Sequence, residues 1–254
     1  MVIKSNGSRR TVSVLPLLGL IDHTLLKPEA IAAQIKVLCQ EAMEYGFGAV
    51  CVLPTWVPKA VELLKDSRVK TCTVVGFPLG GNTTRVKVIE ATQAIEQGAQ
   101  EIDVVINLGA LKDGEDDLVR EELQQVVEAA GRSGPSVLRG LARPKVIVKV
   151  ILETSLLNKE EKIRACLLAQ AAGADFVKTS TGFGPGGATV EDVRLMREAI
   201  GPTMGIKASG GIRDLEGAMA LLAAGATRLG TSAGVALATE WEARKKLGEQ
   251  CPSQ

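Results

Sequence analysis

One unit recurs along this chain: a helical stretch stops at a glycine, and a strand rich in β-branched residues begins within a few residues of it. Clear junctions of this kind lie at 45–49, 97–99, 172–174 and 224–226. Glycine adopts the left-handed conformation that ends a helix, and the short connection returns the chain at once to a sheet. A chain that alternates in this way builds parallel strands covered by helices.

The alternation predicts strands at 20–23, 49–53, 71–76, 101–107, 145–152, 176–179, 205–208 and 228–230, with helices between them, for example at 31–44, 85–97, 118–130 and 160–171. Eight strands within 254 residues match the size and rhythm of an α/β fold, the (β/α)8 TIM barrel. A doubly wound sheet is the alternative. It usually carries Gly-x-Gly-x-x-Gly after an early strand, whereas the similar string at 182–187 follows a late strand and contains Pro185.

A single domain is expected over residues 1–254, with flexible tails at 1–15 and 249–254 and a longer loop at 131–144. The hydrophobic fraction of 46% is enough for one large core. No apolar run approaches the ~20 residues needed to span a bilayer. Pro16 interrupts the apolar stretch near the start of the chain, so we expect no targeting segment and no membrane partner.

Charge and aromatic content exclude one class of partner. The 30 basic and 29 acidic residues are well mixed, and aromatic residues make up only 3% of the chain. Nucleic acid is therefore not expected, because both a basic surface and stacking side chains are missing. The five cysteines are scattered and contain no Cys-x-x-Cys, which indicates reduced thiols in a cytoplasmic protein.

Three lysines interrupt strands that are otherwise apolar. Lys149 lies within 146–152, Lys178 within 174–182, and Lys207 within 205–211. A lysine in a buried strand costs several kcal/mol unless it is paired or neutral. An amine held in a dry, cationic pocket is how proteins make a nucleophilic lysine. These lysines therefore point to a reactive site rather than to a purely structural one.

Polar side chains gather where the predicted strands end, which is where a barrel carries its active site. Asp22 and Thr24 close the first strand, Asp103 lies in the fourth, and Glu153 follows the fifth. If the lysine-bearing faces point inward, ammonium and carboxylate groups share a space in which like charge and desolvation both lower a lysine pKa. A neutral amine there can form a Schiff base with a carbonyl. The same residues also fit a buried ion network, and this alternative is strongest for Lys149.

The residues give metal chemistry little support. His23 is the only histidine, so the chain cannot build a zinc site with two or three histidines. Asp22, Asp103 and Glu153 form a possible magnesium set, but the nearby lysines compete for these carboxylates. We therefore expect no metal, and we interpret His23 as a structural hydrogen-bond partner rather than a general base.

A second cluster consists of glycine and hydroxyl residues after the last three strands. It comprises Ser180-Thr181-Gly182, Ser209-Gly210-Gly211 and Gly230-Thr231-Ser232-Ala233. Glycines let backbone amides approach an anion, and a helix beginning at Ser232 would direct its N-terminus at it. The loops after the last two strands of this barrel are the usual phosphate site. Ser232 is also explained as a plain helix cap.

Taken in order, the segments 21–26, 75–80, 101–107, 148–154, 175–182, 207–213 and 229–234 resemble the deoxyribose-phosphate aldolase family. The resemblance runs over nearly the whole chain. It implies a TIM-barrel class I aldolase, independent of metal and cofactor, that cleaves 2-deoxy-D-ribose 5-phosphate to D-glyceraldehyde 3-phosphate and acetaldehyde. A homo-oligomer, dimer or tetramer, is also expected from the family.

The resemblance also implies residue roles. Lys178 corresponds to the Schiff-base lysine, Lys207 to the neighbour that keeps it uncharged, Asp103 to the proton-transfer carboxylate, and Lys149 to a supporting charge. The positions expected to line the substrate pocket are Asp22, Thr24 and Cys51, and those expected to hold the phosphate are Thr181, Gly182, Gly210, Gly211, Gly230 and Ser232.

The chain departs from the family pattern at two places. Some members carry a lysine just after the Thr-Gly of the phosphate loop, where this chain has Phe183, so phosphate binding should depend more on backbone amides. Some members also end in a tyrosine that assists proton transfer, whereas Tyr45 is the only tyrosine here. Two other functions stay open: a Schiff-base aldolase for another phosphorylated sugar, and an inactive sugar-phosphate binding protein.

Overall fold

The computed structural model describes residues 17–132 and 145–246. The tails expected at 1–15 and 249–254, and nearly all of the loop expected at 131–144, lie outside these residues. Within them, no helix has the length and apolar character that crossing a membrane would require.

Eight parallel strands close into a barrel in chain order, which confirms the predicted (β/α)8 fold over the doubly wound sheet. They are β1 (Ile21–Leu25), β2 (Ala49–Val52), β3 (Lys70–Val75), β4 (Glu101–Val105), β5 (Ile147–Ile151), β6 (Phe176–Lys178), β7 (Gly205–Ser209) and β8 (Arg228–Thr231). The barrel closes where Ile21 of β1 pairs with Leu229 of β8.

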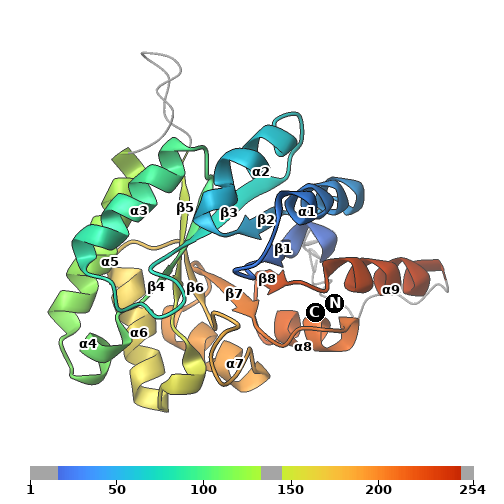
Figure 1. Cartoon of the computed structure of the whole chain (residues 1–254). Helices are drawn as coiled ribbons and strands as arrows, with labels where there is room; N and C mark the ends of the chain where they lie inside the picture. Colours follow the sequence, from blue (N-terminus) through green and yellow to red (C-terminus); the bar gives the residue numbers. More distant parts are fainter. Residues whose placement is uncertain (1–16, 133–144, 247–254) are drawn as a thin grey trace, which may run out of the picture.

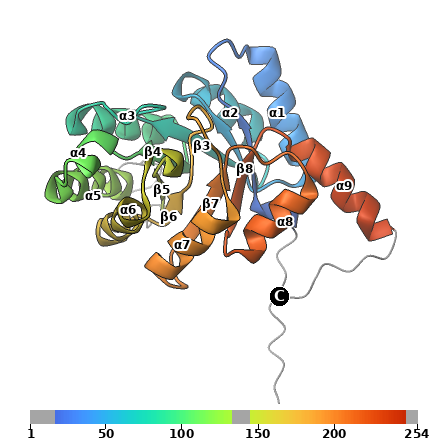
Figure 2. The same cartoon turned by 90° about the horizontal axis from the view of Figure 1, so that it is seen from below.

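Helices surround the strands, as Figures 1 and 2 show from two directions. They are α1 (Ala32–Tyr45), α2 (Val57–Leu64), α3 (Thr84–Glu96), α4 (Leu108–Lys112), α5 (Asp116–Arg132), α6 (Lys159–Ala171), α7 (Val190–Ile200), α8 (Leu215–Ala223) and α9 (Gly234–Lys246). Short 3-10 turns lie at Leu17–Leu20, Pro54–Trp56 and Thr154–Leu156. The main core lies between the strands and these helices and includes Val50, Val104 and Ile206.

Local sequence explains how the elements begin and end. The four junction glycines, Gly46, Gly98, Gly173 and Gly225, all have positive φ values, from 70° to 113°. Any residue that has a Cβ atom is destabilised in that conformation. Glycine is not, so it ends one helix here and allows the next strand to start. At the other helix end, Asn158 caps α6 by accepting from the Glu161 amide at 2.8 Å.

Several predicted boundaries differ from the structure by one or two residues, and two of them differ for a similar reason. The fourth strand was expected to reach Asn107 but ends at Val105, because the Asn107 side chain accepts from the Ala110 amide at 3.1 Å and caps α4. The last helix was expected at Ser232 but begins at Gly234. In both places a local hydrogen-bonding turn, not the end of the apolar pattern, decides the boundary.

The barrel interior is partly apolar and partly ionic. Its apolar cluster contains Leu26, Ala49, Cys51, Cys72 and Val74. The opposite wall contains two glycines that make room for large side chains. A Cβ on Gly205 would lie 2.3 Å from the Phe176 ring, and one on Gly230 would lie 2.9 Å from Cε of Lys207. The glycines therefore determine how the neighbouring side chains fit inside the barrel.

Candidate active site

The three lysines that interrupt apolar strands all lie inside the barrel. Lys149, Lys178 and Lys207 are 0%, 3% and 1% exposed. Strand register places Lys178 directly beside Lys207 and places Asp103 beside Lys149. Because alternate side chains of a strand face the same way, these neighbours all point toward the barrel axis. The predicted grouping of lysines and a carboxylate is therefore present.

Asp103 lies at the centre of this group. Its Oδ2 accepts from Lys178 Nζ at 2.9 Å and from Lys207 Nζ at 2.8 Å, while its Oδ1 accepts from Lys149 Nζ at 2.8 Å. Burial alone would raise the pKa of Asp103, but the three ammonium groups outweigh it and hold the pKa well below its usual value. Asp103 therefore stays ionised, and its oxygens can orient a water.

Lys207 is held as a cation. Its Nζ donates to Asp22 as well as to Asp103. Burial lowers the pKa of Lys207, but Asp103 and Asp22 together raise it above its ordinary value. The Lys207 ammonium therefore contacts the same oxygen of Asp103 as the Lys178 amine does.

Lys149 is the most heavily paired lysine of the three. Its Nζ lies 2.7 Å from Glu101, 2.8 Å from Asp103 and 3.7 Å from Asp22. Burial lowers the pKa of Lys149, yet these carboxylates and Cys72 raise it well above normal. The general expectation of a lowered lysine pKa therefore does not hold for Lys149 or Lys207, because the barrel contains more carboxylates than the strand ends suggested.

Sequence reasoning missed two members of this network. Arg228 Nη1 donates to Asp22 Oδ1 at 2.6 Å, and its Nη2 lies 3.3 Å from Glu101 Oε1. Both residues stand two positions before a predicted site residue in the same strand, Glu101 before Asp103 and Arg228 before Gly230. This two-residue spacing puts them on the inward face and was the signal available in the sequence.

The residues expected to line the substrate pocket differ in their contacts. Asp22 is fully buried, and its pKa is lowered because Lys207, Lys149 and Arg228 together outweigh burial. Thr24 Oγ1 donates to the Asp22 carbonyl at 2.8 Å. Cys51 lies in the apolar half of the barrel beside Cys72, and a hydrogen bond between the two thiols lowers the pKa of Cys51.

The glycine-hydroxyl loops meet at one end of the barrel. Gly182, Gly210 and Gly211 have φ values of 84°, 86° and 79°, which only glycine adopts readily. A Cβ on Gly210 would lie 3.7 Å from the Cα of Gly182, so the two loops are in contact. Within the described part of the chain, the backbone amides of Gly182, Gly211 and Ser232 make no hydrogen bond. Free amides of this kind suit an anion.

Two of the expected phosphate positions have other contacts. The Thr181 hydroxyl donates to Glu153, and the Thr181 amide donates to the same carboxylate at 3.2 Å. Gly230 leaves space for Lys207, as described above. Glu153 itself has a φ of 53°, so the chain turns sharply after β5 and directs this carboxylate to the phosphate loop.

The family comparisons agree with this geometry. The model of the DeoC/LacD aldolase family matches residues 17–238. The chain belongs to the DeoC/LacD family of aldolases. This confirms the resemblance seen in the sequence motifs, and it confirms that the chain is an aldolase, a carbon–carbon lyase.

Individual relatives of this aldolase are similar over most of their length. A deoxyribose-phosphate aldolase of a Geobacillus species is 58% identical over 218 residues, which cover 86% of this chain and 92% of that protein. One from Caldanaerobacter subterraneus is 54% identical over 234 residues, which cover 92% and 97%. Among solved structures, the tetrameric deoxyribose phosphate aldolase of Aeropyrum pernix has a TM-score of 0.79 at 35% identity, covering 89% of this chain and 91% of that one.

In this aldolase, His23 lies outside the barrel interior. Its Nε2 lies 2.7 Å from Glu41 of α1, and its ring packs against Phe47 at 5.2 Å between centroids. These contacts match the interpretation of His23 as a structural hydrogen-bond partner. The side chain points away from Asp22 and Thr24, its neighbours in β1, because strand side chains alternate.

Two groups of described residues bring metal-ligating atoms within 4.8 Å of one another: Cys51, Cys72 and Asp103, and Asp22, Cys72 and Glu101. The Lys149 ammonium contacts Cys72, Asp103 and Glu101, and so occupies the position between their ligand atoms as a cation. Glu153, considered with Asp22 and Asp103 for magnesium, is directed to Thr181 instead. A divalent ion here would have to displace a buried, paired lysine, so neither group fits one.

Proposed function

We propose that this chain cleaves 2-deoxy-D-ribose 5-phosphate to D-glyceraldehyde 3-phosphate and acetaldehyde through a Schiff base on Lys178. The observation that carries the proposal is that Lys178 and the cationic Lys207 share one oxygen of Asp103. Lys178 has a single carboxylate partner, whereas Lys149 and Lys207 each have at least two. It is therefore the lysine of the three with the fewest ion pairs to break when it attacks a carbonyl.

The reaction begins when the free amine of Lys178 attacks the C1 aldehyde of the open-chain sugar. Loss of water gives a protonated imine, which is an electron sink. A water hydrogen-bonded to Asp103 then takes the proton of the C3 hydroxyl while the C2–C3 bond breaks, its electron pair passes to the imine, and glyceraldehyde 3-phosphate leaves. The remaining enamine is protonated at its terminal carbon, and water hydrolyses the resulting imine to acetaldehyde and free Lys178.

The other residues hold the substrate and the charge balance. Lys207 stays protonated and disfavours a second positive charge on Lys178, while Lys149 neutralises Asp103 from its other oxygen. The free amides at Gly182, Gly211 and Ser232 bind the phosphate, far from the breaking bond, and so orient the sugar. The names of the relatives support this choice of substrate.

Trapping with acetaldehyde and borohydride tests the Schiff base. Reduction should leave an ethyl group on Lys178, which peptide mass mapping locates, and Lys178→Met should remove both the adduct and the cleavage activity. Lys36→Met, on the exposed face of α1, is the matched control and should keep both. An adduct on another lysine, or activity surviving in Lys178→Met, would refute the assignment.

A substrate panel separates this function from its alternatives. An aldolase for another phosphorylated sugar would turn over that sugar faster than deoxyribose 5-phosphate, and a binding protein would turn over neither. We also propose a single catalytic domain in a cytoplasmic homo-oligomer, a dimer or tetramer. The free thiols of Cys39, Cys51, Cys72 and Cys166 support the proposed location in the cytoplasm, where thiols stay reduced. Light scattering coupled to size-exclusion chromatography measures the number of subunits.

A further inference from the structure

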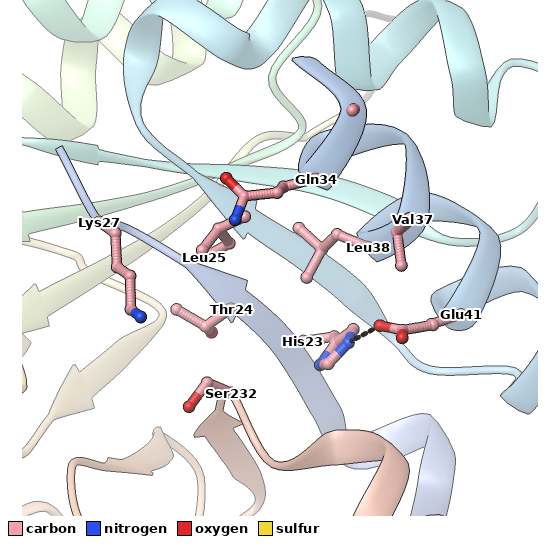
Figure 3. A pocket seen from close by; sticks show the side chains of 10 residues that line it. His23, Thr24, Leu25, Lys27, Gln34, Val37, Leu38, Glu41 and Ser232 are labelled. Carbon is pink, nitrogen blue, oxygen red and sulfur yellow. Dashed lines mark hydrogen bonds and ion pairs between the residues drawn. The ribbon is translucent and has the colours of Figure 1, made fainter. Parts of the chain in front are cut away.

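A pocket of about 440 Å³ opens beside the barrel mouth, between the end of β1, the start of α1 and the turn before α9. Figure 3 shows two polar ends. Lys27, Thr24 and Ser232 lie at one end, and His23 with Glu41 at the other. Ser232 is one of the residues assigned above to the phosphate, so this pocket extends the proposed phosphate site toward β1.

The charges at the two ends differ in how they are satisfied. His23 and Glu41 contact each other at 2.7 Å. Lys27 is exposed, and no carboxylate among the described residues pairs with it. It is the sole cation among the residues that line this pocket, again within the described chain. One end of the pocket therefore carries an uncompensated positive charge.

The backbone around Lys27 is held firmly although its side chain is not. The buried Leu26 precedes it, and its own carbonyl accepts from the Ala30 amide at 3.1 Å, which closes a turn containing Pro28. Such a turn fixes the direction of the backbone at Lys27, while its exposed side chain has no ion-pair partner among the described residues. A lysine mounted in this way can reach toward an anion without distorting the strand before it.

Across the pocket, the Ser232 amide makes no hydrogen bond to any described residue, while the next amide, of Ala233, donates to the Thr231 hydroxyl at 2.9 Å. Ser232 precedes the 13-residue helix α9, whose N-terminus favours negative charge. Phe183 directly follows Gly182 in the loop after β6; it is 53% exposed and packs edge-on against Phe77. That loop thus supplies an aromatic ring where a cation would strengthen phosphate binding.

We propose that Lys27 supplies the cationic contact to the substrate phosphate, replacing from the β1 side the charge that is missing at Phe183. The inference rests on the proposed function and names a specificity-determining residue for it. Lys27 selects the phosphorylated sugar over its unphosphorylated form and takes no part in the covalent steps at Lys178.

The test compares kcat/KM for 2-deoxyribose 5-phosphate with that for unphosphorylated 2-deoxyribose. Lys27→Met should lower this ratio by about 10- to 100-fold, the effect of losing one charge-assisted hydrogen bond. The inhibition constant of inorganic phosphate should rise by a similar factor. Lys27→Arg should keep most of the ratio, and Lys36→Met should leave it unchanged, with thermal melting used to confirm that each variant is folded.

Arg213, exposed and two residues after Gly211, provides the discriminating comparison. If Arg213→Met lowers the ratio and Lys27→Met does not, the phosphate is bound from the β7 side and the inference is overturned. An unchanged ratio in both variants also overturns it. If the unmodified protein fails to cleave deoxyribose 5-phosphate, the proposed function fails instead, which is a different result.

Discussion

At the scale of single residues, three buried lysines differ because of their second contacts. All three donate to Asp103, but Lys149 also lies against Glu101, and Lys207 also donates to Asp22. A lysine with several carboxylates around it keeps its proton, whereas one that shares a single oxygen with another cation loses it more easily. The proposed division between nucleophile and supporting charge thus follows from the number of ion pairs.

The role of Lys207 gives a prediction about pH. In Lys207→Leu the fixed cation beside Lys178 is gone, so more of the Lys178 amine stays protonated at a given pH. The acid limb of the pH–rate profile should move to higher pH by about one unit or more. Lys70→Leu, at the opposite end of the barrel, is the control. A profile that keeps its position in Lys207→Leu would contradict this electrostatic role.

A charged site residue could be predicted from the sequence only where its neighbours in the chain are apolar. Lys178, Lys207 and Asp103 lie within apolar strands, and therefore were predicted. Glu101 and Arg228 begin their strands and look like surface residues in the sequence. Their burial follows from barrel closure, which brings Arg228 within 2.6 Å of Asp22, 206 residues away. Pairing over that distance leaves no local pattern.

At the scale of elements, hydrophobic periodicity predicted the eight strands, and the four helices for which it gave bounds, to within about two residues. Glycine junctions were reliable because positive φ is a backbone requirement that few residues meet. Periodicity did not predict α4, a helix of five residues that depends on the Asn107 cap. Short elements of this kind are stabilised by one side-chain hydrogen bond, which carries no periodic signal.

The two interior glycines allow a paired test within neighbouring strands. Gly230→Ala and Gly205→Ala each add one methyl group to a crowded wall, and each should destabilise the fold by about 1–3 kcal/mol in chemical denaturation. Only Gly230→Ala pushes against Lys207, so it should lower kcat as well, whereas Gly205→Ala pushes against Phe176. Equal losses of kcat in both variants would show that general overpacking, rather than displacement of Lys207, is responsible.

At the scale of the whole molecule, the ionic interior ties stability to pH. Asp22 and Asp103 have pKa values below the ordinary 3.8, because their lysine and arginine partners outweigh burial. Carboxylates with depressed pKa values stabilise the fold above about pH 4, and this contribution is lost as the pH falls toward their folded values. Glu122 has a raised pKa, chiefly because it is buried. Its contribution to stability therefore has the opposite pH dependence: it is present below the ordinary pKa of 4.5 and is lost as the pH rises.

The free energy of unfolding should therefore decline steadily below about pH 4, by up to about 1.4 kcal/mol per pH unit for each of the two carboxylates. Urea titrations at a series of pH values measure the slope. In Asp22→Asn the slope should become shallower whatever the absolute stability. A slope equal to that of the unmodified protein would mean that the pKa of Asp22 is not strongly lowered in the folded state.

Barrel closure has a consequence for the protein during its synthesis. Asp22 leaves the ribosome long before Lys207 and Arg228, the partners that lie 185 and 206 residues further along. At ordinary translation speeds of about 5–20 residues per second, roughly 10–40 s pass between the synthesis of Asp22 and that of its cationic partners. The synthesis of β8 completes both the hydrogen-bonded ring and the charge balance around the buried lysines. A nascent chain is thus inactive until β8 has been translated.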